Sequence, residues 1–208
     1  VQRRTLLQDL KDPEPAIQRS IQRHRLVIDW IESRSDIDAG RVALFGASLG
    51  AFNALFLAAL DERVSAAALA LVGGSLPDVL VVSNERRVEE AISQTKKELS
   101  LDDEALIAYL EEKIVTDPLM LAPHMNAARV LLVQAKRDKT VPFPRQIELR
   151  EAMARPETIT LPTGHVTAAA YLFYLRSRVA RFFDRKMAEE SAHGTAIIPA
   201  SACEEVKT

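Results

Sequence analysis

The sequence contains a single cysteine among its 208 residues, Cys203, which excludes an internal disulfide and a cysteine-rich metal site. Its four histidines, His24, His124, His165 and His193, lie too far apart in sequence to form a metal-binding motif. A glycine-rich phosphate-binding loop is also missing, so nothing supports a nucleotide-driven activity. We therefore expect no metal and no other cofactor.

The chain also lacks an excess of charge and any long hydrophobic run. It has 27 basic and 29 acidic side chains, a net charge of −2, and its basic residues are interspersed with acids, so no nucleic-acid partner is expected. No stretch approaches the roughly 18 uncharged apolar residues of a membrane span. No signal-peptide pattern is found at the N-terminus, which favours a cytoplasmic location. The chain begins at Val1 rather than methionine, so it is either processed or a piece of a longer protein.

Four short apolar runs alternate with segments of helical periodicity. With 48% hydrophobic residues, the chain is expected to form one globular domain. The apolar runs are residues 41–46, 63–74, 129–138 and 157–165, and the helical segments are residues 14–35, 49–60 and about 168–186. This alternation predicts an α/β fold, a three-layer sandwich with a mostly parallel sheet between helices.

Residues 78–122 differ from the rest because they are highly charged. Leu106, Leu110 and Ile114 recur at helical spacing within them, which predicts helices with a solvated face. Ser100 followed by Asp103 is typical of a capping box that starts the second of two helices. The tail, residues 187–208, is expected to be disordered or loosely docked.

A serine stands at the point where the first strand gives way to a helix. Ser48 lies between Gly46 and Gly50 in a G-x-S-x-G motif, which holds a serine hydroxyl above the sheet edge on a strained turn. The glycines are expected to relieve clashes with the neighbouring strand and helix. The backbone N–H of Leu49, at the start of the helix, would be one donor of an oxyanion hole. The alternative is a tight turn between small residues with no chemical role.

Two further reactive residues follow the last two strands. Asp138 and His165 each lie just past a predicted strand, so they meet Ser48 at the same edge of a parallel sheet. A serine hydroxyl becomes nucleophilic when a base takes its proton and a third group orients that base. Asp78, after the second strand, is a less favoured candidate for the acid. The alternative reading of Asp138 and His165 is an ordinary loop aspartate and a surface histidine.

The motifs "GASLG", "RDKTVP" and "TGH" around Ser48, Asp138 and His165 resemble the α/β-hydrolase superfamily, in particular its dienelactone-hydrolase-like and esterase-like branch. The resemblance covers roughly residues 20–186. It implies a serine hydrolase that cleaves a small-molecule carboxylic ester through an acyl-enzyme. Ser48 would be the nucleophile, His165 the general base and then acid, and Asp138 the group that orients His165. It also implies a hydrolase domain over residues 1–186, with residues 78–122 as a helical cap.

The chain departs from this family in two places. Gln134-Ala135 stands where the family usually carries a His-Gly pair. The family also has several strands before the serine turn, and the loop after one of them donates the second oxyanion N–H. Here the preceding residues are mostly helical and contain no His-Gly or Gly-Gly motif, so the chain is the C-terminal portion of the fold or lacks that donor. Such a half-sheet exposes an edge strand, which leaves a homo-oligomer as an open alternative.

Two other functions are compatible with the same residues. The motif fixes the nucleophile and not the leaving group, so a peptidase or an acyltransferase would use the same three side chains. A hydrolase fold can also serve as a non-catalytic module that binds a ligand or partner.

Overall fold

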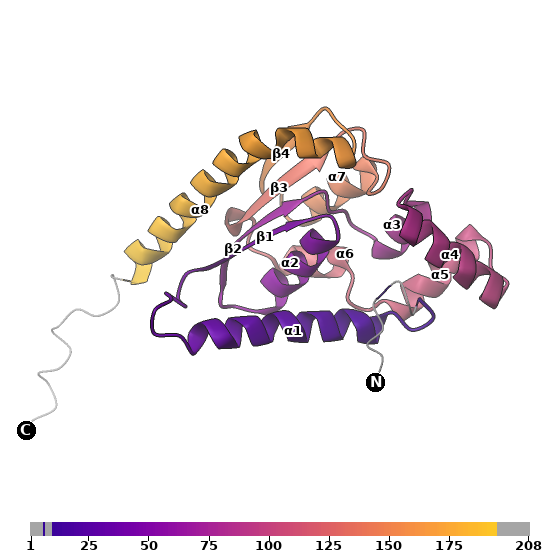
Figure 1. Ribbon diagram of the computed structural model, residues 1–208, viewed down its shortest axis with the longest axis horizontal. Helices are drawn as coiled ribbons and strands as arrows, with labels where there is room; N and C mark the ends of the chain where they lie inside the picture. Colours follow the sequence, from indigo (N-terminus) through magenta and orange to yellow (C-terminus); the bar gives the residue numbers. More distant parts are fainter. Residues whose placement is uncertain (1–5, 7–9, 195–208) are drawn as a thin grey trace, which may run out of the picture.

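The computed structural model describes residue 6 and residues 10–194, which form a parallel sheet with helices on both faces (Figure 1). The strands are β1 (Val42–Ala47), β2 (Val64–Ala70), β3 (Val130–Ala135) and β4 (Glu157–Leu161). They lie in the order β1-β2-β3-β4, and each neighbouring pair is parallel. The predicted α/β class with a parallel sheet is confirmed.

The two central strands are uniformly apolar because both of their faces are covered. Every residue of β2 and β3 is buried, as expected of parallel strands between helical layers. The outer strands are only partly buried, and Phe45 on β1 is 56% exposed. Among the described residues β1 has a strand on one side only, so it forms an open edge of the sheet.

Helices cover both faces of the sheet in the described part of the chain. The first face carries α1 (Glu14–Glu32), α2 (Leu49–Leu60) and α7 (Phe143–Ala152), and the second carries α8 (Leu172–Gly194) (Figure 1). Leu69 and Leu132 pack in one core with Leu55 and Leu149, on the side of α2 and α7. Ala68 and Val133, on the opposite side, pack in a second core that contains Phe182 of α8. Successive side chains of the two central strands therefore point to opposite faces and into different cores. Val42 and Val64, at the starts of β1 and β2, pack in a further cluster with Ile28 of α1 and Leu57 of α2.

The charged segment forms helices between β2 and β3. These are α3 (Leu76–Val82), α4 (Arg86–Leu99), α5 (Asp103–Lys113) and the short α6 (Pro118–Leu121), followed by 3-10 turns at Ala122–His124 and Ala127–Arg129. Figure 1 shows α3, α4 and α5 together at one end of the molecule. Leu106 and Leu110 are fully buried beneath them, as their spacing predicts. Asp117, the N-cap of α6, links the start of that helix to α3, because its carboxylate accepts the N–H of Leu76 at 2.7 Å.

Several sequence-based boundaries differ from the structure. The N-cap of α5 is Asp102, whose side chain accepts the N–H of Ala105, so the predicted capping box at Ser100 is wrong. Ser100 instead ends α4 in a left-handed conformation, with φ 56°. The last helix reaches Gly194 rather than residue 186, and residues 195–208 of the predicted tail lie outside the described residues. Within the described part of the chain, no helix is long and apolar enough to cross a membrane.

Candidate active site

Ser48 occupies a strained turn between β1 and α2. Its φ of 53° and ψ of −124° lie in a region that non-glycine residues rarely adopt, at a cost of about 1–3 kcal/mol. Backbone hydrogen bonds hold the turn from both sides: the Ser48 N–H donates to the carbonyl of Ala70 on β2 at 2.9 Å, and the Ser48 carbonyl accepts the N–H of Ala51 at 2.8 Å. The serine is thus fixed between a strand and the first turn of a helix.

The two glycines of the motif have different surroundings. A Cβ atom on Gly46 would lie 2.2 Å from the carbonyl oxygen of Gly50, so only glycine lets α2 begin so close to β1. A Cβ atom on Gly50 would meet nothing within 4 Å. The expectation that both glycines relieve clashes therefore holds for Gly46 and is wrong for Gly50 among the described residues.

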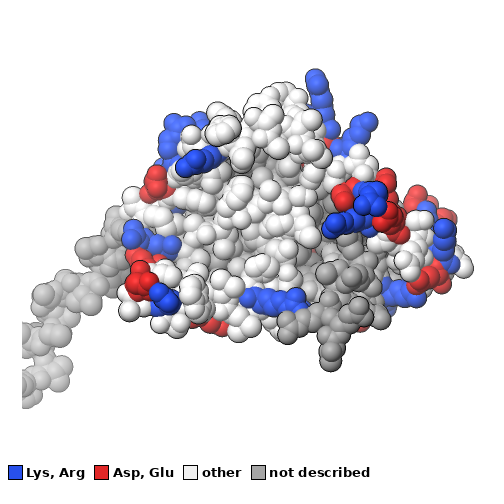
Figure 2. All heavy atoms as spheres, in the orientation of Figure 1, with Lys and Arg blue, Asp and Glu red and all other residues white. Residues whose placement is uncertain are grey.

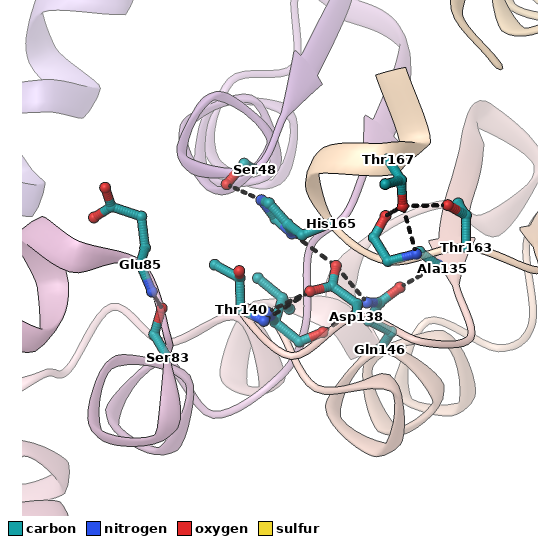
Figure 3. A network of polar contacts seen from close by, with 12 residues as sticks. Ser48, Ser83, Glu85, Ala135, Asp138, Thr140, Gln146, Thr163, His165 and Thr167 are labelled. Carbon is teal, nitrogen blue, oxygen red and sulfur yellow. Dashed lines mark hydrogen bonds and ion pairs between the residues drawn. The ribbon is translucent and has the colours of Figure 1, made fainter. Parts of the chain in front are cut away.

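The three predicted side chains form one hydrogen-bonded chain (Figure 3). His165 Nε2 lies 2.8 Å from Ser48 Oγ, and His165 Nδ1 lies 2.7 Å from Asp138 Oδ2. A carboxylate only accepts hydrogen bonds, so the proton belongs on Nδ1, and Nε2 is free to accept the serine hydroxyl. The structure thus brings together residues that follow β1, β3 and β4, at the carboxyl ends of the strands.

Asp138 is held by four hydrogen-bond donors. Its side chain is fully buried, and its Oδ1 accepts the backbone N–H groups of Thr140 and Val141, both at 2.9 Å. Its Oδ2 accepts from His165 and, at 3.2 Å, from Gln146 Nε2. These contacts satisfy the carboxylate in a site without water access, as a buried charge requires.

The loop that carries His165 is tied to the loop that carries Asp138. The Arg137 N–H donates to the Thr163 carbonyl at 2.8 Å, so the two loops continue the pairing of β3 with β4. A Cβ atom on Gly164 would lie 3.2 Å from the Arg137 carbonyl oxygen, so a glycine suits this close approach. The side chain of His165 keeps 15% of its surface exposed, and Figure 3 shows its ring between Ser48 and Asp138.

Leu49 is the first residue of α2, so its backbone N–H has no carbonyl partner one turn earlier in the helix. The N-terminus of a helix attracts negative charge, which suits the predicted oxyanion role. From residue 10 to β1, the described chain contains α1 and no strand. No loop after an earlier strand is therefore available among these residues to supply a second N–H.

The other candidate acid lies elsewhere. The Asp78 carboxylate accepts the hydroxyl of Ser75 at 2.6 Å and pairs with Arg145 at 2.7 Å. His165 is bonded to Asp138 instead. Among the described residues, no group of three or more histidine, cysteine, aspartate or glutamate side chains could hold a metal ion.

Two neighbouring contacts were not foreseen from the sequence. Gln146 on α7 is fully buried and donates to Asp138. Thr140 donates its hydroxyl at 2.8 Å to Oδ1 of Asn84, which lies in the loop between α3 and α4. Thr140 lies in the RDKTVP motif, which gave no indication of this contact, and Gln146 lies outside the motifs quoted above. Their roles depend on which loops the fold places side by side.

No protein-family model and no curated protein matches the chain. Solved structures do. An esterase from Pyrococcus furiosus, Pf2001, superposes with a TM-score of 0.60 at 16% identity, over 79% of this chain and 61% of the esterase. An acetyl xylan esterase from Paenibacillus sp. R4 gives a TM-score of 0.57 at 21% identity, over 81% of this chain and 51% of that one. The alpha/beta hydrolase GrgF from Penicillium sp. sh18 gives 0.60 at 17% identity, over 83% and 73%.

The chain has the α/β-hydrolase fold. At these identities the similarity concerns the fold alone. The chain spans less than two thirds of the length of the two esterases. Within the described residues, the part of the fold that is present includes a sheet of four strands.

Proposed function

We propose that the protein is a serine hydrolase that cleaves a carboxylic ester through an acyl-enzyme, with Ser48 as the nucleophile. The observation that carries the proposal is the continuous hydrogen-bonded chain from Ser48 through His165 to Asp138. A buried carboxylate, an oriented imidazole and a serine on a strained turn at a helix start are the parts that acyl transfer requires. The esterases among the similar structures support an ester as the substrate.

In the acylation step, Ser48 Oγ attacks the ester carbonyl carbon while its proton passes to His165 Nε2. Asp138 accepts the Nδ1–H and stabilises the imidazolium that forms. The carbonyl oxygen becomes an oxyanion, to which the Leu49 N–H donates. The intermediate then collapses, the bond to the alkoxy group breaks, and His165 returns its proton to the departing alcohol.

In the deacylation step, water takes the place of the alcohol. His165 Nε2 removes a proton from the water as its oxygen attacks the acyl carbon, and the bond from the acyl carbon to Ser48 Oγ breaks. The proton passes from His165 back to Ser48, and the carboxylic acid leaves. One ester and one water thus give one acid and one alcohol, with no net change in the protein.

The proposal is tested by labelling with a fluorophosphonate and by turnover of p-nitrophenyl esters. We expect a covalent adduct on Ser48, located by peptide mass spectrometry, and loss of both label and turnover in Ser48→Ala. In related triads the nucleophile is worth about 10⁶ in kcat. Ser93→Ala, at an exposed position of α4, is the control and keeps both.

Three other results would change the assignment. A labelled Ser48 with turnover of peptide amides and none of esters would indicate a peptidase. Transfer of the acyl group to an added alcohol in preference to water would indicate an acyltransferase. An unlabelled chain would indicate a non-catalytic binding module.

A further inference from the structure

Gln146 is a fully buried amide directly behind the acid of the proposed triad (Figure 3). It projects from α7, where a polar side chain without partners would be costly. Its Nε2 donates to Asp138 Oδ2 at 3.2 Å and to the Val141 carbonyl at 2.7 Å, and its Oε1 accepts the N–H of Ala135 at 3.0 Å. The amide therefore connects the last residue of β3 with the loop that carries the acid.

Only one orientation of this amide satisfies its neighbours. The Ala135 N–H can only donate, so it requires the amide oxygen. The Asp138 carboxylate and the Val141 carbonyl can only accept, so they require the amide nitrogen. A hydrocarbon side chain would remove the hydrogen bonds that the amide makes with the Ala135 N–H, the Val141 carbonyl and Asp138 Oδ2. An ionised carboxylate would place a third acceptor against the Val141 carbonyl and the Asp138 carboxylate.

The remaining contacts of Asp138 come from its own loop or from His165. The N–H groups of Thr140 and Val141 belong to the same loop as the acid and move with it. Gln146 instead links Oδ2 to the end of the buried strand β3, which is part of the rigid sheet. Because Oδ2 is also the atom that accepts His165 Nδ1, rotation of the carboxylate would break the contact to the imidazole.

We propose that Gln146 is a positioning residue that fixes the Asp138 carboxylate against His165. This role in turnover rests on the proposed function, in which Asp138 orients the catalytic histidine. Gln146 contacts Asp138 and would act on turnover through it. The cost of misplacing a catalytic group by about 1 Å reaches about 100-fold in rate. We therefore expect Gln146→Met to lower kcat by about 10- to 100-fold and to leave KM nearly unchanged.

Gln134 provides a matched control. It lies at 2% exposure on β3, and its Nε2 donates to the backbone carbonyl of Gln146 at 2.7 Å. Gln134→Met removes a buried amide of the same size from the same strand–helix contact without touching Asp138. Both variants are expected to lose stability in urea unfolding, Gln146→Met more than Gln134→Met because its side chain makes more buried hydrogen bonds. Gln134→Met is expected to keep kcat within about threefold.

A double-mutant cycle with Asp138→Ala tests whether Gln146 acts through the acid. The loss in kcat caused by Gln146→Met should disappear in the Asp138→Ala background. A loss of the same size in both backgrounds, or an equal loss in Gln134→Met, would overturn the proposal and indicate a structural role. If Gln146→Met does not fold, Gln146→Glu enters the same cycle, since it keeps the shape and the acceptor toward Ala135.

A spectroscopic measurement separates this proposal from the enzyme function. The proton NMR resonance of the His165 Nδ1–H reports the contact to Asp138 whether or not the chain turns over an ester. We expect it to be lost or shifted in Gln146→Met and retained in Gln134→Met. Retention in Gln146→Met overturns the positioning role, whereas absence of Ser48-dependent labelling overturns only the proposed function.

Discussion

The two halves of the candidate site differ in how firmly the described chain encloses them. Asp138 and His165 follow adjacent strands, and the acid is fully buried with four donors around it. Ser48 follows the open edge strand β1, and its neighbours Phe45 and Leu49 are 56% and 61% exposed. The carboxylate of the proposed triad is thus packed like a core residue, whereas the proposed nucleophile lies beside an exposed edge strand.

The surface around β1 is correspondingly poor in charge. In the orientation of Figure 1, the space-filling view shows a broad face with few charged side chains, and charges gather toward its rims (Figure 2). Natural edge strands usually carry a lysine, a proline or a bulge with a charged residue that prevents pairing. The six residues of β1 include neither a charge nor a proline, and the register shift in its pairing with β2 lies at its start, between Val42 and Ala43. The three side chains of the proposed triad are therefore hydrogen-bonded to one another even though the strand that leads to Ser48 is an exposed edge strand.

Beyond the loss of the nucleophile in Ser48→Ala, the next largest effect on kcat is expected from a change in the enclosed half. Asp138→Asn keeps the size of the side chain but presents a donor or a weaker acceptor to His165, so the imidazole loses its orienting charge. In a comparable triad this change costs about 10⁴ in kcat, and we expect a similar loss in p-nitrophenyl ester hydrolysis. Asp78→Asn, which breaks the pair with Arg145, serves as the control and should change kcat by less than about threefold. A larger loss in Asp78→Asn would move the acid to Asp78.

Substitutions at the two glycines of the serine turn test the half of the site that contains Ser48. Gly46→Ala forces a Cβ atom to within 2.2 Å of the Gly50 carbonyl oxygen, so we expect it to destabilise the fold by about 3 kcal/mol or more in urea unfolding. The Cβ atom that Gly50→Ala adds would meet no other atom within 4 Å. Position 50 lies in α2, and alanine is favoured over glycine in a helix by up to about 1 kcal/mol. The substitution should therefore be neutral or stabilising. A strong destabilisation by Gly50→Ala would mean that the β1 edge is covered in solution, which would break the comparison.

Local sequence patterns predicted the presence of helices and strands more reliably than the residues at which they end. The apolar run at 63–74 indicates a buried strand, but β2 ends at Ala70, because Leu71 turns the chain out of the sheet with φ 58°. Leu71 and Val72 remain buried after this turn, so hydrophobicity alone gives no signal of the strand's end. Similarly, Ser100 and Asp102 are both good capping residues, and the geometry of the preceding helix decides between them.

The candidate site likewise contains residues that the sequence predicts and one that it does not. Ser48, Asp138 and His165 are predictable because each chemical type follows a strand, and parallel strands bring their carboxyl ends to one edge. Gln146 is not predictable, because a lone glutamine in a helix with Arg145 and Glu148 is typical of a solvated face. Its burial follows from the packing of α7 against the end of β3, which no local pattern encodes.

A smaller effect concerns the attachment of α1 beside the open edge. Asp61, after α2, is buried at 4% exposure and accepts hydrogen bonds from Arg63 and from Arg25 of α1. Arg63 in turn pairs with Asp29 and Glu32 at the end of α1. These contacts join the helix that covers α2 to the start of β2. They lie at the opposite end of the strand from Ser48, so the site should not sense them directly.

Asp61→Asn should therefore weaken the fold in a pH-dependent way and leave labelling of Ser48 unchanged. The hydrogen bonds from Arg63 lower the pKa of Asp61 from its ordinary value of 3.8 to about 2, against the opposing effect of burial. A depressed carboxyl pKa stabilises the fold above the unfolded-state value and loses that contribution as the pH falls toward 2. We expect Asp61→Asn to lower the thermal midpoint by a few degrees at pH 6, with the difference from the native chain closing between about pH 4 and pH 2. A difference that stays constant over this range would show that packing, rather than charge, holds α1 beside the exposed half of the site.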